Sequence, residues 1–400
     1  MTPSHKSRPR ILLSRLSKKT GTRTVTPHEI LDLTAFCSID GVLVRSANAI
    51  PHASRTLQFL QRNSIPFILL TNGGGNHESE RVKDLSCKLD VKLDTSMFVQ
   101  SHTPFAELVH GENSLRDKCI MVVGGEGGRC RDVAEMYGFT NVVTPGDIYA
   151  AYPEIWPFSK PFLQDYYKSF ARALPKPIDS ASPEESLKID AVFVYNDPRD
   201  WGLDLQVILD VLLSREGVMG TYSAKNGDRS LPNCGYLQDN QPPLYFSNPD
   251  LLWAAHYHLS RLGQGGFRES LEGLWRAVTA HSHGTPELYK TVIGKPYRET
   301  YSFAENLLMR HRDSLFGSAT PLRRVYMVGD NPESDIRGAN NYDSPHGVEW
   351  VSLLTRTGVF RDRPGHTPTW EPRAIVDDVR AAVQYALKDT AWDQGLDQLD

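Results

Sequence analysis

The stretch Ala35–Leu43, with the sequence AFCSIDGVL, constrains the fold of this chain more than any other. Its apolar run ends in Ser-Ile-Asp-Gly, a pattern that predicts a buried strand ending at a glycine turn. Side chains two positions apart on a strand share a face, so Ser38 and Asp40 should point the same way from the strand end. Ligands bind at the carboxyl ends of strands in open α/β sheets. This stretch is therefore the first candidate for a functional site.

Strand and helix signals alternate along the chain after residue 30. This alternation predicts an α/β fold in which helices cover both faces of a parallel sheet. The apolar segments expected to form strands are 66–70, 118–125, 190–196, 243–248, 323–328 and 350–354. The segments expected to form helices are 54–63, 80–89, 103–111, 131–139, 163–174, 203–215, 266–281, 301–312 and 379–388.

Composition excludes several classes of protein. A length of 400 residues allows two domains, or one domain with a large insertion. The net charge of −4 does not indicate a nucleic-acid binder, and no stretch is long and apolar enough to span a membrane. The five cysteines are scattered and never spaced as CxxC, so neither a disulfide framework nor a zinc site is expected. Oligomeric state stays open.

Both ends of the chain are expected to lie outside the fold. Residues 1–28 contain seven lysines and arginines and no acidic residue. This composition is typical of a transit peptide and equally of a disordered basic tail, so the predicted location is mitochondrial or cytoplasmic. Residues 391–400 are expected to form a frayed tail.

Chemically active residues follow strand ends at three further places. The first is the segment Thr71–Gly75, TNGGG, directly after the strand at 66–70. The second is Lys295, in a loop after a short apolar segment, and the third is Asp330, followed by Asp335. A parallel sheet would bring all of these to the same edge as Ser38 and Asp40.

The chemistry of these residues is complementary. Carboxylates hold Mg²⁺ through oxygen, usually with several waters. The hydroxyl of Thr71 and the N–H groups of Asn72, Gly73 and Gly74 can donate to phosphoryl oxygens, and Lys295 adds positive charge. Taken singly, each residue has a structural explanation as a turn, a helix cap or a solvated lysine. Taken as an ordered set, they predict a phosphoryl-transfer site.

The motifs SIDG, LLTNGGG, IGKP and VGDNPESDIRGAN resemble, in this order, the four motifs of the haloacid dehalogenase (HAD) superfamily. The stretches TNGGG, QSHTPF, SNPDLLWA, LGQGGF and GDNPESDIRGAN resemble subfamily IIA and, within it, the cat-eye-syndrome-region-5-like hydrolases. The resemblance covers about residues 30 to 388. It implies a Rossmann-like parallel-sheet core (the HAD fold) at 29–125 and 286–390, interrupted by an inserted α/β cap domain of C2 type at 126–285.

The resemblance also implies a function and roles for residues. The function is Mg²⁺-dependent, phosphatase-type hydrolysis of a small phosphorylated molecule. Asp40 would act as general acid and base and as a metal ligand, Thr71 would bind phosphate, and Lys295 would neutralise the phosphoryl group. Asp330 would bind the metal, and Asp335 would bind it through water or orient the lysine. The residues that would contact the substrate are Asn72, Gly73, Gly74, Ser247, Asn248, Asp250 and the loop around Gln264.

One position departs from the family pattern. Ser38 stands where the family has the aspartate that attacks phosphorus. A serine hydroxyl is a weak nucleophile until a base removes its proton, so a serine-phosphate mechanism is not expected. Three accounts stay open: loss of hydrolysis with retention of binding, altered chemistry in the same pocket, or a change in the gene model.

Two further motifs allow more than one interpretation. The glycines of GQGG, residues 263–266, could present N–H groups to an anion or could serve turn geometry. His281 and His283 could suggest a metal pair, but with no third ligand nearby in sequence we expect a polar loop.

Overall fold

The computed structural model describes residues 34–45, 48–253, 257, 259–280, 284–317, 321–361, 365 and 367–392. The basic segment 1–28, His281, His283 and most of the expected tail at 391–400 lie outside these ranges. Within them, no helix is long and apolar enough to cross a bilayer.

The first large sheet has six parallel strands in the order β15-β14-β13-β1-β4-β5. From β1 the chain continues to β4 and β5 on one side, and the strands β13 to β15 lie on the other side. This reversal of direction marks the place where open α/β sheets bind ligands. The strand bounds are β1 (Ala35–Cys37), β4 (Phe67–Leu70), β5 (Phe98–Val99), β13 (Arg324–Gly329), β14 (Glu349–Thr355) and β15 (Ala374–Val376).

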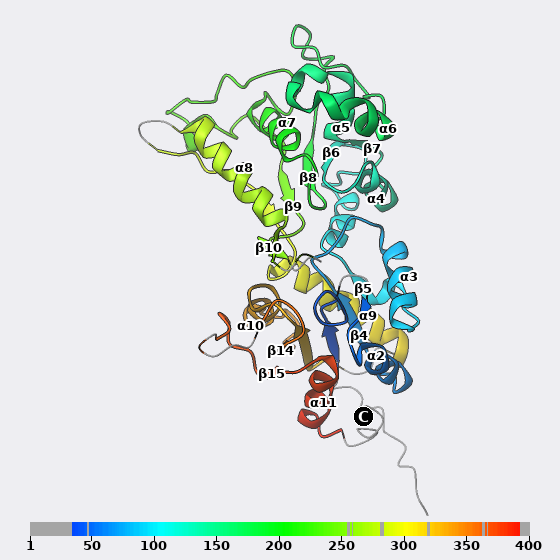
Figure 1. Cartoon of the computed structure of the whole chain (residues 1–400). Coiled ribbons are helices and arrows are strands. Elements are labelled where there is room, and N and C mark those ends of the chain that lie inside the picture. Colours follow the sequence, from blue (N-terminus) through cyan, green and yellow to red (C-terminus); the bar gives the residue numbers. More distant parts are fainter. Residues whose placement is uncertain are drawn as a thin grey trace, which may run out of the picture.

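Helices cover this sheet and bury a continuous apolar core with it (Figure 1). The helix α2 packs against α11, and α9 packs against α10 and β4. The strand β1 is entirely buried, which agrees with its unbroken apolar sequence. The helix bounds are α2 (Ala53–Arg62), α3 (Glu78–Leu89), α9 (Arg298–Phe316), α10 (Arg337–Asn341) and α11 (Val379–Asp389).

The second large sheet has five parallel strands in the order β12-β9-β8-β6-β7 and apolar clusters of its own. Figure 1 shows it as a separate layered unit beyond the first sheet. Its strands are β6 (Cys119–Val123), β7 (Asn141–Val143), β8 (Ala191–Val194), β9 (Leu244–Phe246) and β12 (Thr291–Val292). Its main helices are α4 (Arg129–Tyr137), α5 (Pro145–Ala151), α7 (Trp201–Leu213) and α8 (Gln264–Thr279).

This sheet extends beyond the limits expected for the inserted domain, and the domain limits themselves stay a prediction. The range 126–285 leaves out β6 and β12, which pair with β8 and β9. The second sheet therefore extends from residue 119 to residue 292. The sequence of β6 predicts a buried strand correctly, but an apolar run carries no information about which sheet it joins.

Local predictions differ from the structure mainly where the helices are short. The segment predicted as a helix at 103–111 is a 3-10 helix, η2 (Thr103–Val109), and the helix predicted at 163–174 ends at Phe170. The strands β7 and β15 and the helix α5 were not predicted. The remaining short elements are β2 (Val44–Arg45), β3 (Asn48–Ala49), β10 (Leu252–Trp253), β11 (Arg261–Leu262), η1 (Thr95–Met97), η3 (Pro153–Ile155), η4 (Pro157–Phe162), η5 (Leu163–Tyr167), α6 (Lys168–Phe170), η6 (Pro232–Gly235) and η7 (Pro332–Ile336).

Candidate active site

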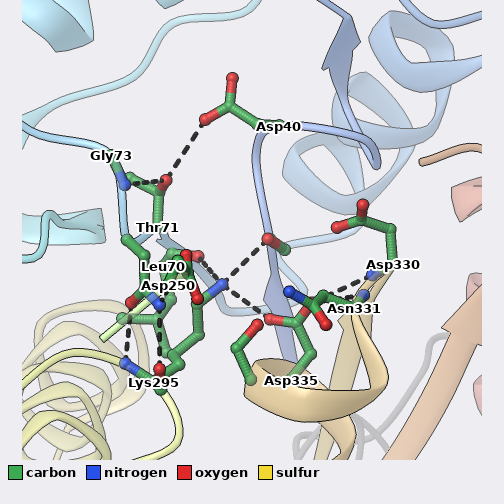
Figure 2. A network of polar contacts seen from close by, with 12 residues as sticks. Asp40, Leu70, Thr71, Gly73, Asp250, Lys295, Asp330, Asn331 and Asp335 are labelled. Carbon is green, nitrogen blue, oxygen red and sulfur yellow. Dashed lines mark hydrogen bonds and ion pairs between the residues drawn. The ribbon is translucent and has the colours of Figure 1, made fainter. Parts of the chain in front are cut away.

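Lys295 lies at the centre of the polar cluster at the carboxyl edge of the first sheet (Figure 2). Its loop follows β12, and the residue is 2 % exposed. The ammonium nitrogen Nζ donates to Asp335 Oδ1 at 2.7 Å, to Ser38 Oγ at 3.0 Å and to the carbonyl of Leu70 at 3.2 Å. The lysine therefore connects the ends of β1 and β4 with the segment after β13.

Asp335 is fully buried, and both of its carboxylate oxygens are engaged. Oδ1 pairs with Lys295, and Oδ2 accepts from the N–H groups of Asp330 and Asn331 at 3.0 Å each. Gly329 permits this approach, since a Cβ there would lie 2.1 Å from the Cβ of Asp335. These contacts favour a role in orienting Lys295, and direct coordination of a metal by Asp335 stays a prediction.

Asp330 lies at the end of β13 and is buried. Its Oδ2 accepts from the N–H of Val359 at 2.7 Å. Burial, reinforced by the charge of Asp335, raises the pKa of Asp330 to about 7. Gly41 and Gly358 lie directly against the carboxylate. A Cβ at Gly41 would lie 2.3 Å from Oδ2, and a Cβ at Gly358 would lie 1.9 Å from it.

Asp40 and Ser38 follow β1, but their surroundings differ. Ser38 continues the sheet, since its N–H donates to the carbonyl of Val328, and its side chain is buried. Asp40 is exposed and accepts a hydrogen bond from Thr71 Oγ1 at 3.4 Å. The two residues therefore offer a buried hydroxyl beside Lys295 and an accessible carboxylate beside Thr71.

The TNGGG segment forms a compact turn after β4. Thr71 Oγ1 accepts from the N–H of Gly73 at 2.9 Å, so one of the three predicted phosphate donors is used within the turn. Among the described residues, no hydrogen bond uses the N–H of Asn72 or that of Gly74. These two groups can donate to an anion.

The side chain of Asn72 joins the two sheets. Its amide exchanges two hydrogen bonds with the backbone of Lys295, at 2.7 and 2.9 Å, and donates to Asp250 Oδ2 at 3.1 Å. Asp250 follows β9, and burial raises its pKa to about 6. The side chain of Asn72 therefore holds the loop of Lys295 in place. A contact between Asn72 and substrate stays a prediction, and it concerns the backbone N–H, because the side-chain amide is already engaged.

Ser247 and Asn248 line the second sheet's side of this junction. The buried hydroxyl of Ser247 donates to the carbonyl of Tyr195 at 2.9 Å and accepts from Gln264 Nε2 at 3.1 Å. The N–H of Asn248 donates to Gln264 Oε1 at 2.8 Å. Both residues thus connect the segment after β9 with Gln264. A contact between either residue and substrate stays a prediction.

The glycines of GQGG serve close packing. The N–H of Gly265 donates to the carbonyl of Asp250 at 2.9 Å, and that of Gly266 donates to Gly263. A Cβ at Gly265 would lie 2.3 Å from the carbonyl oxygen of Pro249. These glycines therefore serve turn geometry and do not bind an anion, because the N–H groups of Gly265 and Gly266 already donate to backbone carbonyls.

The sequence did not reveal every residue near this cluster. Asn196 follows β8, and a Cβ at Gly75 would lie 3.1 Å from its side-chain Cγ. His102 follows β5 and accepts from the N–H of Gly75 at 3.1 Å. Both follow strand ends, which is the signal that could have identified them.

Comparison with known proteins agrees with the motifs. The model of the haloacid dehalogenase-like hydrolases matches residues 35–140, and a HAD-hydrolase-like model matches 292–382. A mitochondrial hydrolase of Saccharomyces cerevisiae is 38 % identical over 368 residues, which cover 88 % of this chain and 94 % of that protein. The chain belongs to the haloacid dehalogenase-like hydrolases.

Two further proteins extend the comparison. A fusion of cardiolipin synthase (CMP-forming) and a mitochondrial hydrolase in Schizosaccharomyces pombe is 40 % identical over 92 % of this chain, which spans only 56 % of that protein. A 4-nitrophenylphosphatase from Thermotoga maritima has the same fold, with a TM-score of 0.53 and 14 % identity, covering 89 % of this chain and 98 % of its own. The fold expected from the motifs is confirmed.

Proposed function

We propose that this haloacid dehalogenase-like protein is a Mg²⁺-dependent, phosphatase-type hydrolase of a small phosphorylated molecule. One observation carries the proposal: Lys295 lies within hydrogen-bond distance of Ser38 and Asp335, beside the turn that presents the free N–H groups of Asn72 and Gly74. Phosphoryl transfer depends mainly on positioned donors and positive charge around the transferred group. We further propose that the second sheet and its helices act as a cap over this site.

The residues present fit a magnesium ion. Asp40 after β1 and Asp330 after β13 offer oxygen donors, and the Ser38 hydroxyl lies at the same end of β1 as Asp40. In the described part of the chain, no cluster of three or more His, Cys, Asp or Glu side chains could enclose a metal. Magnesium commonly keeps several waters and binds through one or two carboxylates with substrate phosphate, so two carboxylates are sufficient. When bound, the ion would neutralise charge on the phosphoryl oxygens.

The chain's own residues would divide the remaining work. Lys295 would neutralise a phosphoryl oxygen, and Thr71 with the free N–H groups would orient the group. Asp40 is accessible and would give a proton to the leaving group and take one from the attacking water. Within the described residues, no carboxylate or imidazole forms a hydrogen bond with the Ser38 hydroxyl, which therefore has no bonded base to make it a nucleophile.

The direct test is hydrolysis of 4-nitrophenyl phosphate by the unmodified chain. We expect slow turnover that requires Mg²⁺ and stops with EDTA. Asp40→Asn should lower the rate by about 100-fold, since it removes the acid and base while keeping the size of the side chain. A rate unaffected by EDTA or by Asp40→Asn would contradict the proposed function.

Ser38 favours a second candidate, a protein that binds a phosphorylated molecule without hydrolysing it, or that carries out different chemistry in this pocket. This candidate predicts that the unmodified chain binds Mg²⁺ and inorganic phosphate but does not hydrolyse phosphate esters. Calorimetric titration of the unmodified chain with both, beside the hydrolysis assay, separates the two candidates.

The pKa of Asp330 predicts how metal binding depends on pH. Its folded-state pKa of about 7 lies above the usual value for an aspartate, so between about pH 4 and pH 7 the folded chain keeps a proton that the unfolded chain has released. Without metal, this group therefore lowers stability as pH rises. Because Mg²⁺ binds the ionised carboxylate, it should raise the melting temperature more at pH 8 than at pH 5.

Thermal unfolding with Mg²⁺ or EDTA at both pH values measures this effect. Asp330→Asn is the control, since it cannot ionise and should abolish the difference between the two pH values. An equal Mg²⁺ effect at both would show that Asp330 does not hold the ion.

We also propose a mitochondrial location for this chain. The two relatives at 38 % and 40 % identity are both named as mitochondrial hydrolases or fusions of one. Residues 1–28 are basic and lack acidic residues, which is the composition of mitochondrial transit peptides. Fluorescence microscopy of the chain with a C-terminal fluorescent tag tests the location.

A further inference from the structure

Three consecutive residues after β5 hold the loop that follows Thr71 and Asn72. We call Gly73–Asn76 the glycine loop. The side chain of Gln100 donates to the carbonyl of Asn76 at 2.9 Å, and the N–H of Ser101 donates to that of Gly73 at 3.3 Å. The third contact is reversed, since His102 Nε2 accepts from the N–H of Gly75 at 3.1 Å. The glycine loop is thus held at Gly73, Gly75 and Asn76.

The contacts of His102 determine where its proton lies. The side chain is fully buried, and Nε2 must carry a lone pair because it accepts from an N–H. The ring proton is therefore on Nδ1, which lies 2.8 Å from Tyr137 Oη. Burial lowers the pKa of His102 to about 4, so the ring is neutral near pH 7 and remains an acceptor.

Glu78 fixes the direction of the next hydrogen bonds. The residue is 5 % exposed, and its Oε1 accepts from Tyr137 Oη and from Thr103 Oγ1. Because an ionised carboxylate only accepts, Tyr137 must donate to Glu78, and its oxygen is left to accept from His102. A relay of hydrogen bonds therefore runs from Gly75 through His102 and Tyr137 to Glu78, with His77 as the other titratable neighbour of Glu78.

The ring of His102 also limits what can stand at Gly74. A Cβ at Gly74 would lie 2.7 Å from His102 Cδ2 and 2.9 Å from Ser101 Oγ. The glycine loop can therefore lie directly against the imidazole only because it has no side chain there. Tyr137 belongs to α4, beside the second sheet, so the relay connects this loop with both parts of the molecule.

We propose that His102 is a positioning residue: through its hydrogen bond to Gly75 it fixes the glycine loop in the conformation that leaves the N–H groups of Asn72 and Gly74 free for a phosphoryl group. The inference rests on the proposed function, which assigns phosphate binding to these N–H groups. His102 does not touch the phosphate. It acts through the loop, and Tyr137 and Glu78 hold its tautomer.

The test measures binding of inorganic phosphate to the full chain in the presence of Mg²⁺, by calorimetry. His102→Ala should weaken binding by about tenfold, which corresponds to the loss of one buried hydrogen bond. His102→Gln keeps an acceptor near the position of Nε2 and should restore affinity to within about threefold of the unmodified chain. Tyr326→Phe is the matched control for Tyr137→Phe, since both remove a phenol hydroxyl bonded to a carboxylate, and Tyr326 contacts Asp389. Only Tyr137→Phe should weaken phosphate binding.

Amide hydrogen exchange in a peptide containing residues 73–76 gives a second measurement that does not depend on the proposed function. His102→Ala should speed this exchange at least tenfold, while Tyr326→Phe should leave it unchanged. If the unmodified chain binds no phosphate but the exchange prediction holds, the proposed function fails and the role of His102 in holding the loop stands. If phosphate binds and neither affinity nor exchange changes in His102→Ala, the inference is wrong. Equal losses in His102→Ala and His102→Gln would also overturn it, because a requirement for imidazole itself would then be indicated.

Discussion

Replacing Ser38 with aspartate should raise Mg²⁺-dependent hydrolysis of 4-nitrophenyl phosphate by on the order of a thousandfold or more. The reason is chemical: a carboxylate attacks phosphorus as a ready anion, whereas among the described residues no carboxylate or imidazole forms a hydrogen bond with the serine hydroxyl to remove its proton. The magnitude follows from the losses of several orders of magnitude seen when catalytic nucleophiles are removed from enzymes.

The site can accept this carboxylate. Ser38 Oγ lies 3.0 Å from the ammonium of Lys295, so an aspartate here would gain a charged partner. It would also add a negative charge near Asp330 and Asp335, and the rate increase should therefore require Mg²⁺. Without the metal, the same substitution should lower the melting temperature.

Ser38→Asn is the control for Ser38→Asp, because it has nearly the same shape but neither charge nor nucleophilicity. It should stay at the rate of the unmodified chain. A Ser38 chain that already turns over as fast as Ser38→Asp would show that the serine does not limit hydrolysis. Metal and phosphate binding without turnover in either form would favour the second candidate function.

The sequence predicted the convergence at the first sheet because this depends on local signals. Ser38, Thr71 and Asp330 each follow an apolar strand, and parallel strands present their carboxyl ends at one edge. Lys295 was predicted for the same site from its motif, and its side chain reaches Ser38 and Asp335 in the structure. The pattern of strands was sufficient for Ser38, Thr71 and Asp330, whereas Lys295 follows β12, a strand of the second sheet.

Other features depend on packing between distant segments, which periodicity does not encode. The strands β6 and β12 join the second sheet although their sequences fit either sheet equally well. The relay of His102, Tyr137 and Glu78 joins residues up to 59 positions apart. A histidine in a sequence gives no sign of its tautomer or burial, so its role could be inferred only from its contacts.

The buried pair of Lys295 and Asp335 leads to the prediction with the largest effect on stability. Both side chains are almost fully buried, and Nζ lies 2.7 Å from Oδ1. Removing one partner leaves an uncompensated charge in a water-poor site, which typically costs about 3–5 kcal/mol of stability. We therefore expect Lys295→Met to lower the free energy of unfolding by an amount in this range.

The double variant Lys295→Met with Asp335→Asn separates the charge effect from packing. Asp335→Asn alone should also destabilise, since it leaves the lysine without its anion and turns an acceptor of two N–H groups into an amide. In the double variant neither charge remains, so its loss should be smaller than the sum of the single losses by about 2 kcal/mol. Equilibrium unfolding in urea measures the free energy of unfolding of the two single variants and of the double variant.

Lys88→Met is the matched control, because Lys88 pairs with Asp84 at the same distance of 2.7 Å, but on the surface of α3. Exposed pairs contribute about 1 kcal/mol or less, so this substitution should hardly change the unfolding curve. If Lys295→Met and Lys88→Met were equally mild, water would have to reach Asp335 in solution, and the surroundings of this carboxylate would be more open than its contacts indicate. If only Lys295→Met is severe, Asp335 keeps its charge in the folded chain, and that charge holds the lysine where a phosphoryl group would meet it.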